Sequence, residues 1–356
     1  MDEVNQWVSV HVYTTTPLDT VIRELLPELL SDLREQGLIE SWFFLRHWAD
    51  GPHLRVRLRL AEAEHDEQVR ALVSTHITAL YSRIPPSRPM AEQDYLELAR
   101  RLAVWEPDVE VGGLAPNDSH AFVPYRPEHG KYGYGFALRA AEEHFAVCSE
   151  LALAAVCEGW GEQQRGAHCF ALLAGGIATP PAGPAASSAI QDLYRRQRAA
   201  LLPVARAARA APDMPPGPDR DPAGRWLDSV RTAGVHAADP GTLAAGLGHL
   251  ACNRLGLRLG QEAVLRGLAS LAVRDLAARD VAAHSSLAQD SAARDVAAHG
   301  LLAQDPATRA SLAQDPAAQN LADVAASRSA SSSATSSATN SLTSSTDRVE
   351  PERGLS

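Results

Sequence analysis

Arginine and histidine side chains recur at every second position of residues 53–60, which read HLRVRLRL. Successive side chains on a β-strand point to opposite faces, so these four share one face, with an apolar face behind them. The cationic set comprises His53, Arg55, Arg57 and Arg59. Like charges in register repel one another unless an anion faces them, and guanidinium groups bind carboxylates, phosphates and enolates well. The stretch predicts anion recognition; the alternative is the solvated outer face of a two-layer fold.

A second candidate group lies near the end of the apolar part of the chain. Residues 239–256 predict a helix that starts at Asp239-Pro240 and stops at Gly256. His249 and Asn253 are four positions apart and share one face of this helix, with Arg254 beside them. An imidazole titrates near neutral pH, so His249 is the best candidate for proton transfer. The alternative is a histidine that only satisfies its helix neighbours.

A loop rich in glycine, proline and tyrosine covers residues 123–135. Loops of this kind often contribute to binding sites. The side chains that could line such a site are Tyr125, Arg126, Glu128, His129, Lys131 and Tyr132. No strand-to-helix nucleotide motif surrounds the loop's glycines, which argues against nucleotide binding.

Hydrophobic patterning predicts the elements that position these groups. Residues 41–60 read as a hairpin around Asp50-Gly51, and residues 7–13 alternate as a further strand. Thr16-Pro17 offers a cap and a first helical residue for a helix that runs to Gly37.

Further helices are expected from the apolar spacing downstream. They cover residues 62–83, 91–104, most of 136–210 from Phe136 onward, and 261–272. The pattern predicts an α+β fold with a mainly antiparallel sheet, helices packed on one of its faces and a helical C-terminal half.

Composition limits the class of protein. The chain has 356 residues, 45% of them hydrophobic, and a net charge of −10, which argues against a broad nucleic-acid surface. Its four cysteines show no CxxC pair and no metal-ligand spacing, so we expect buried free thiols and no metal site. There is no signal peptide and no apolar run of about eighteen residues. We therefore expect a cytoplasmic protein without membrane contact.

The character of the sequence changes after residue 272. Residues 279–293 are nearly repeated by 294–308, and 328–346 are almost entirely Ser, Ala and Thr. Such compositions bury little apolar surface. We expect one domain at 1–272, short Ala/Asp-rich repeats at 273–327, and a tail at 328–356 that is disordered or weakly helical.

Three segments, taken together, resemble a known family. They are WFFLRHWADGPHLRVRLRL, YRPEHGKYGYG followed by EEHF, and GHLACNRLGL. In order and spacing they are similar to the thiopeptide-type bacteriocin biosynthesis domain, the glutamate-elimination domain of class I lanthipeptide dehydratases. This domain also occurs as a stand-alone protein in thiopeptide pathways. The resemblance covers roughly residues 5–272; each motif is weak alone, and the ordered set is fairly specific.

The resemblance implies a lyase of ribosomal peptide natural product biosynthesis. Such a domain removes glutamate from glutamylated Ser or Thr of a precursor peptide and leaves dehydroalanine or dehydrobutyrine. Arg55 and Arg57 match the paired arginines of the family's HLRLR strand, and His249 matches the histidine of its H-x-x-x-N-R-L segment. Lys131 stands where the family usually has an arginine, and Tyr134 where it has a second glycine.

The residue types suit this chemistry. β-Elimination needs a base for the Cα proton and cations that stabilise the enolate and the departing carboxylate. We expect Arg55, Arg57, Lys131 and His249 to be catalytic. We expect substrate contacts from His53, Arg59, Arg126, Tyr132, Asn253 and Arg254. No cofactor is required.

The implied partners are a precursor peptide with leader and core, and a separate tRNA-dependent glutamylating component. No region of this chain resembles that larger component, and we expect no direct nucleic-acid contact. The sequence leaves a homodimer open.

Two other functions compete with elimination. The same fold is used by pyridine synthases, which join two dehydroalanines in a formal [4+2] cycloaddition and release the leader peptide. A non-catalytic module that binds the precursor peptide by strand addition is the second alternative. Retention of Arg55, Arg57 and His249 favours elimination, whereas the altered residues 131–134 leave the synthase open as an alternative.

Overall fold

The computed structural model describes residues 6–104, 109–176, 186–210, 222–235, 237 and 239–302. The chain divides into two compact units, Met1–Arg279 and Asp280–Ser356. The expected tail at 328–356 and the end of the repeats lie outside the described residues.

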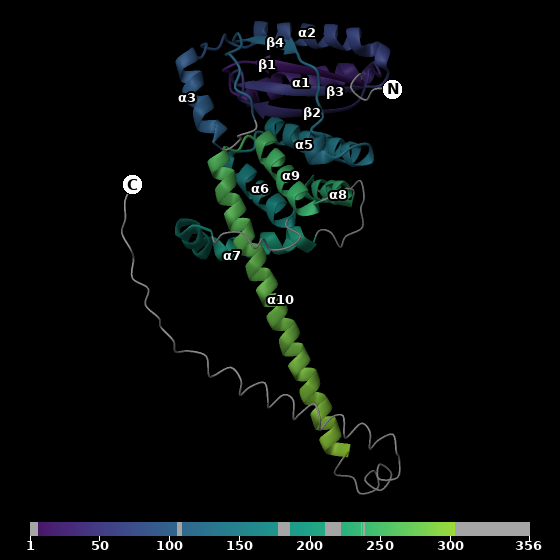
Figure 1. The fold of residues 1–356 in the computed structure, drawn as a ribbon, viewed down its shortest axis with the longest axis vertical. Helices are drawn as coiled ribbons and strands as arrows, with labels where there is room; N and C mark the ends of the chain where they lie inside the picture. Colours follow the sequence, from purple (N-terminus) through teal and green to yellow (C-terminus); the bar gives the residue numbers. More distant parts are fainter. Residues whose placement is uncertain are drawn as a thin grey trace, which may run out of the picture. The chain divides into compact units, whose positions relative to one another are not determined.

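A four-stranded antiparallel sheet forms one part of the first unit (Figure 1). The strands are β1 (Trp7–Tyr13), β2 (Ile39–His47), β3 (His53–Leu60) and β4 (Ser119–Phe122), in the order β2-β3-β1-β4. The first three match the predicted strands, and the fourth was not predicted. The hairpin loop between β2 and β3 is longer than a two-residue turn, yet Asp50 and Gly51 both adopt positive φ, at 63° and 104°.

The apolar face of the sheet packs against α1 (Leu18–Glu35) and α2 (Asp66–Arg83), which contact each other. A 3₁₀ turn, η2 (Ala63–His65), precedes α2. Val10, Val56 and Phe44 are fully buried on this side. The expected Thr16 cap is wrong: Pro17 is the N-cap residue and no side chain caps the helix.

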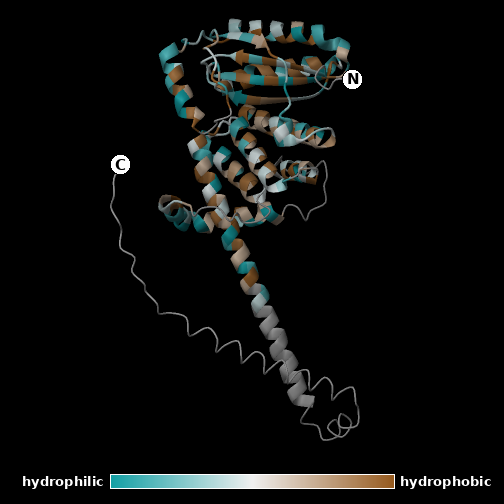
Figure 2. Cartoon of the chain, viewed as in Figure 1, coloured by the Kyte–Doolittle hydropathy of each residue, from teal (hydrophilic) through white to brown (hydrophobic). Residues whose placement is uncertain are grey.

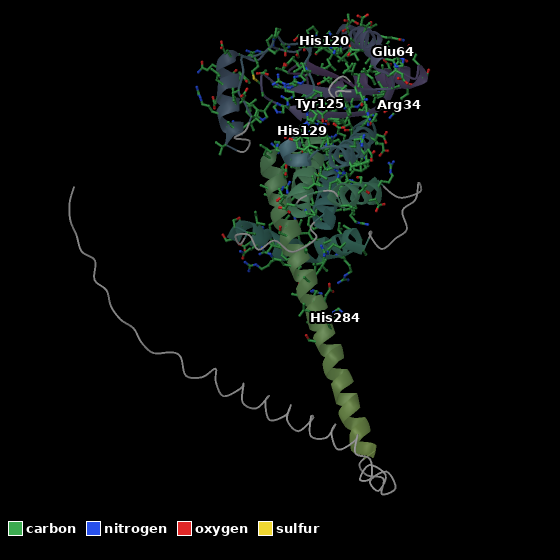
Figure 3. All side chains as sticks on the ribbon, turned by 45° about the vertical axis from the view of Figure 1, so that its right-hand side comes forward. Arg34, Glu64, His120, Tyr125, His129 and His284 are labelled. Atoms are coloured by element: carbon green, nitrogen blue, oxygen red, sulfur yellow. The ribbon has the colours of Figure 1, made fainter. Side chains whose placement is uncertain are left out.

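Other helices approach the opposite, cationic face, so the expectation of helices on one face only is wrong. Phe43 on this face meets Phe145 of α5 (Phe136–Cys157) edge to face, with ring centres 5.3 Å apart, and the ring centres of Trp7 and Tyr125 lie 5.2 Å apart. Figure 3 shows the two sides, with His120 toward α2 and Tyr125 toward the other helices. Figure 2 shows both apolar and polar residues along the strands.

The C-terminal half is helical, as predicted. Helix α3 (Glu92–Ala103) precedes this half. The helices that follow are α4 (His129–Tyr132), α5 (Phe136–Cys157), α6 (Glu162–Gly176), α7 (Ser188–Ala210), α8 (Pro222–Val235), α9 (Pro240–Arg254) and α10 (Leu259–Leu302). Asp239 caps α9 as expected, since its carboxylate accepts from the N–H groups of Gly241 and Thr242. The last helix was expected to end at 272, but α10 continues through the first repeat unit, residues 279–293. The expectation of buried thiols is wrong for Cys157, which is exposed at the last position of α5, whereas the other three thiols are buried.

Candidate functional site

A cavity of about 500 Å³ lies against the cationic face of the sheet. Strands β2 and β3 form one side, the segment around α4 forms a second, and α9 with the start of α10 completes the wall. Six of the ten predicted site residues line it: Arg55, Arg57, Lys131, Tyr132, His249 and Asn253. Residues nearly two hundred positions apart in the sequence therefore meet in one site.

Arg55 is oriented by a hydrogen-bond relay from the hairpin loop. His53 Nδ1 lies 2.8 Å from Gly51 O, and Arg55 Nε lies 2.9 Å from His53 Nε2. A carbonyl can only accept and the guanidinium can only donate, so His53 is neutral with its proton on Nδ1. His53 is completely buried and does not line the cavity, so it supports Arg55 and does not face a substrate.

Two further histidines surround this relay. The rings of His11 and His53 stack at 4.8 Å, and His47 lies 5.3 Å from His53. Burial, together with the positive groups beside them, lowers the pKa of His53 to about 4 and the pKa of both His11 and His47 to about 2. The three imidazoles are therefore neutral near neutral pH and add no charge to the arginine face.

Arg57 is held by aromatic rings. Its Cζ lies 5.0 Å from the ring centre of Tyr125 and 5.5 Å from that of Phe43. Its Nε is buried without a hydrogen-bond partner. Burial and the neighbouring Arg55 lower the pKa of Arg57 to about 10, so the guanidinium is still charged at neutral pH. A desolvated cation with an unsatisfied N–H is suited to an anionic ligand.

The α4 segment supplies the third cation and a phenol. Lys131 Nζ pairs with Glu128 Oε2 at 2.5 Å, and both side chains are exposed. Tyr132 packs edge to face on Phe145 with ring centres 5.0 Å apart. Burial and the Glu128 carboxylate raise the pKa of Tyr132, so its hydroxyl stays protonated.

Asn253 and Arg254, the last two residues of the H-x-x-x-N-R segment, attach α9 to β2 at the edge of the sheet. Asn253 Oδ1 accepts from the N–H of Arg46 at 3.0 Å, and its Nδ2 donates to the carbonyl of the same residue at 2.9 Å. Arg254 Nε donates to Phe44 O at 2.8 Å, and Phe44 N–H donates to Ser149 Oγ at 3.1 Å. These bonds satisfy the outer backbone of β2 and place His249, one turn earlier, in the cavity wall.

Four of the predicted residues do not line this cavity. Besides His53, Arg254 is fully buried with its Cζ 5.3 Å from the Phe145 ring centre. Arg59, on the same face of β3 as Arg55, forms an ion pair with Glu40, with Nε and Oε2 3.4 Å apart. Arg126 is exposed outside the cavity. The period-two pattern could not distinguish Arg59 from Arg55, because the distinction depends on which helix covers each position.

Sequence reasoning gave no role to four charged or histidine side chains of the cavity wall, Arg46, His47, Glu262 and Arg266. Glu262 and Arg266 form an ion pair of 2.7 Å. Their i, i+4 spacing within an otherwise apolar helix was the available signal.

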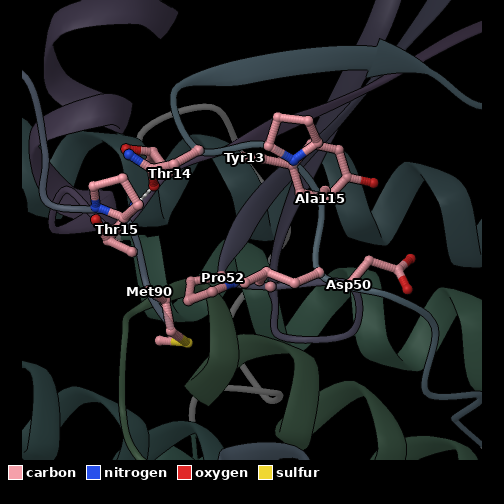
Figure 4. Close-up of a pocket in the computed structure, with 12 residues that line it drawn as sticks. Tyr13, Thr14, Thr15, Asp50, Pro52, Met90 and Ala115 are labelled. Carbon is pink, nitrogen blue, oxygen red and sulfur yellow. Dashed lines mark hydrogen bonds between the residues drawn. The ribbon is translucent and has the colours of Figure 1, made fainter. Parts of the chain in front are cut away.

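A second pocket of about 230 Å³ lies at the hairpin loop (Figure 4). Tyr13, Asp50, Pro52, Met90 and Ala115 are among its lining residues. Among the residues that the structure describes, no Arg, Lys or His lines this pocket, so it offers none of the cations that the predicted chemistry needs.

Within the described ranges, no three His, Cys, Asp or Glu side chains are grouped so that they could hold a metal ion. No described helix is both long enough and apolar enough to span a bilayer.

Comparisons with known proteins agree with this arrangement. No curated protein matches the sequence. Similar solved structures include the pyridine synthase TbtD from thiomuracin biosynthesis, with a TM-score of 0.59 and 21% identity, covering 76% of this chain and 98% of that one. The tRNA-dependent lantibiotic dehydratase MibB from Microbispora sp. 107891 has a TM-score of 0.50 and 21% identity over 79% of this chain, which spans only 29% of MibB. TsrL has a TM-score of 0.50 and 17% identity, covering 76% of this chain and 94% of that chain.

These identities establish a shared fold alone. The sequence model of the family described as lantibiotic biosynthesis dehydratase C-term matches residues 7–273, which contain the sheet, the cavity and its cationic wall. The chain therefore belongs to the lantibiotic dehydratase C-terminal family.

Proposed function

We propose that this protein eliminates glutamate from glutamylated Ser or Thr residues of a ribosomally made precursor peptide. Family membership supports a role in the maturation of such peptides. The observation that carries the proposal is that Arg55, Arg57, Lys131 and His249 line one and the same cavity. It combines a titratable base with cations, which is the set that an elimination requires.

In the proposed step, His249 removes the Cα proton of the esterified residue. The electron pair of the C–H bond becomes the Cα=Cβ double bond, the Cβ–O bond breaks, and glutamate leaves with that bond's electrons as a carboxylate. Arg57 is desolvated and suited to the enolate oxygen or the departing carboxylate, and Arg55 lies two residues away on the same face of β3. His249 then releases its proton to solvent.

The second candidate is the reaction named for TbtD, pyridine synthesis from a dehydrated peptide. The observation that favours it is Lys131, whose charge is already compensated by Glu128 at 2.5 Å. A site with one cation neutralised is less specialised for an anionic leaving group. In this case the substrate would already carry dehydroalanines, and the products would be a macrocycle and a free leader peptide.

Mass spectrometry of a precursor peptide that already carries glutamyl esters tests the proposal. We expect the protein to release glutamate and form dehydrated residues, and His249→Ala or Arg55→Gln to reduce the rate about a hundredfold or more. The matched control is Arg59→Gln, on the same strand and face but outside the cavity and paired with Glu40. Equal losses in both arginine variants would show that the charge of the strand matters and the cavity does not.

Three outcomes would contradict elimination. If glutamates stay attached while a dehydrated peptide is cyclised and loses its leader, the protein is a pyridine synthase. If neither product forms and Arg55→Gln only weakens peptide affinity, it is a binding module. If dehydration proceeds equally well in His249→Ala, the base is another group.

A further inference from the structure

Glu262 is a buried carboxylate in the cavity wall that the proposed elimination step does not use. Its side chain is 7% exposed and lies in the first turn of α10. His249 Nδ1 lies 2.8 Å from its Oε2, and Arg266 Nε donates to its Oε1 at 2.7 Å. Both carboxylate oxygens are therefore engaged by cavity residues.

The charge state of Glu262 determines which nitrogen of His249 carries the proton. Burial alone would raise the pKa of Glu262, but the hydrogen bonds and positive charges of His249 and Arg266 hold this pKa below its ordinary value. The carboxylate is thus ionised and can only accept. Nδ1 of His249 must be the donor, and the lone pair of the neutral ring is on Nε2.

Arg266 fixes the carboxylate in turn. One guanidinium nitrogen binds Glu262, and another donates to the carbonyl of Ala245 on α9 at 2.7 Å. Two contacts therefore join helices α9 and α10: the His249–Glu262 hydrogen bond and the bond from Arg266 to the Ala245 carbonyl. A carboxylate held at both oxygens cannot rotate away from the ring, so the orientation of the ring is set before a substrate arrives.

We infer that Glu262 is a positioning residue that orients His249 and selects its Nδ1–H tautomer, with Arg266 holding Glu262 in place. This inference rests on the proposed elimination, in which Nε2 of His249 is the atom that receives the Cα proton. The carboxylate also stabilises the imidazolium that forms in that step. Glu262 itself does not contact the reacting atoms.

Other charged or titratable groups share the cavity with His249 and bear on its protonation. They are Arg46 and His47 of β2, Arg55 and Arg57 of β3, Glu128 before α4, Lys131 and Tyr132 of α4, and Arg266 of α10. Most of these groups are cations and disfavour the imidazolium. Glu262 is a carboxylate in direct contact with the ring, with its Oε2 2.8 Å from Nδ1.

A first experiment needs no substrate. Long-range ¹H–¹⁵N NMR spectra of the full chain, with His249 assigned by comparison with His249→Gln, report which ring nitrogen is protonated. We expect the Nδ1–H tautomer in the natural protein and its loss in Glu262→Gln. The matched control is Asp275→Asn, another carboxylate of α10, which joins Arg198 of α7 at 2.6 Å away from the cavity. An unchanged His249 tautomer in Glu262→Gln overturns the inference.

A second experiment uses the elimination rate. We expect Glu262→Gln to lower kcat about tenfold to hundredfold, and Glu262→Asp to recover part of the loss. The acid limb of the kcat/KM profile should move to lower pH, because the protonated imidazole loses the negative charge that stabilises it. A merely structural role would lower the rate without moving this limb, and that outcome also overturns the inference.

The two experiments separate the inference from the proposed function. If the natural protein releases no glutamate but the His249 tautomer depends on Glu262, the proposed reaction is wrong and the hydrogen-bond assignment is supported. If glutamate is released normally by Glu262→Gln with an unmoved profile, the reaction stands and the positioning role fails.

Discussion

His53 transmits the geometry of the hairpin loop to a cavity arginine. It bonds Gly51 on one side and Arg55 on the other, and its ring packs 4.7 Å from that of Tyr13. We expect His53→Phe to keep the ring packing but lose the acceptor for Arg55. Because hydrogen bonds to charged groups contribute about 1.5–3 kcal/mol, the elimination rate should fall about tenfold to hundredfold. Initial rates of glutamate release measure this.

His120→Phe is the control for that substitution. This histidine bonds Ser74 at 3.1 Å on the other face of the sheet, toward α2. An unchanged rate in His53→Phe would mean that Arg55 is held without the relay.

At the level of single residues, the sequence predicted the residue types of the site better than it predicted which of them line the cavity. Period-two alternation placed Arg55 and Arg57 on one face, and the cavity contains both. The same alternation assigned a substrate contact to His53, which is completely buried. Local spacing does not reveal which strand positions a helix will cover, so only the folded chain separates supporting residues from lining residues.

Helix α9 is attached to strand β2 by side chains that replace a neighbouring strand. Asn253 makes both a donor and an acceptor bond to the backbone of Arg46. We expect Asn253→Ala to lower the free energy of unfolding by about 1–3 kcal/mol, since two partly buried backbone groups of Arg46 lose their partners. Elimination should also slow, because His249 lies one turn away on the same helix. Urea unfolding followed by fluorescence measures the first effect.

Two further substitutions define that result. Asn253→Asp keeps the acceptor for the Arg46 N–H but places a carboxylate oxygen against the Arg46 carbonyl, so it should destabilise at least as much. Gln163→Ala, at an exposed position of α6, serves as the control. If Asn253→Asp has the same free energy of unfolding as the natural protein, the bond to the Arg46 carbonyl contributes nothing.

The longer helices and three strands could be predicted because each has its own apolar period, whereas the short helix α4 lies in the segment that was predicted to be a loop. Strand β4 could not, because the residues SHAF carry no alternation and become a strand only by pairing with Val10–Tyr13 of β1. The end of α10 was misplaced for a related reason. A change in composition near 273 marked less apolar sequence, but Ala-rich sequence continues a helix well.

The first unit buries several histidines that remain neutral, which ties its stability to pH. Burial lowers the pKa of His144 to about 3, and its Nδ1 lies 2.8 Å from Ser229 Oγ. With His11, His47 and His53, four imidazoles have pKa values of about 2 to 4 in the folded chain, against 6.5 as the ordinary value. At pH values between the folded and the ordinary pKa of these histidines, the unfolded chain binds more protons than the folded one, so stability rises with pH.

We therefore expect unfolding to become easier as the pH falls below about 6.5, the ordinary histidine pKa. Above this pH the four groups are neutral in both states and contribute no slope. Urea midpoints measured between pH 7.5 and 5 should fall steadily. His144→Phe should reduce the slope by removing one of the four groups, whereas His284→Gln, at an exposed position of α10, should not. A midpoint independent of pH in this range would show that these histidines are protonated within the fold, and the neutral Arg55 relay would then be wrong.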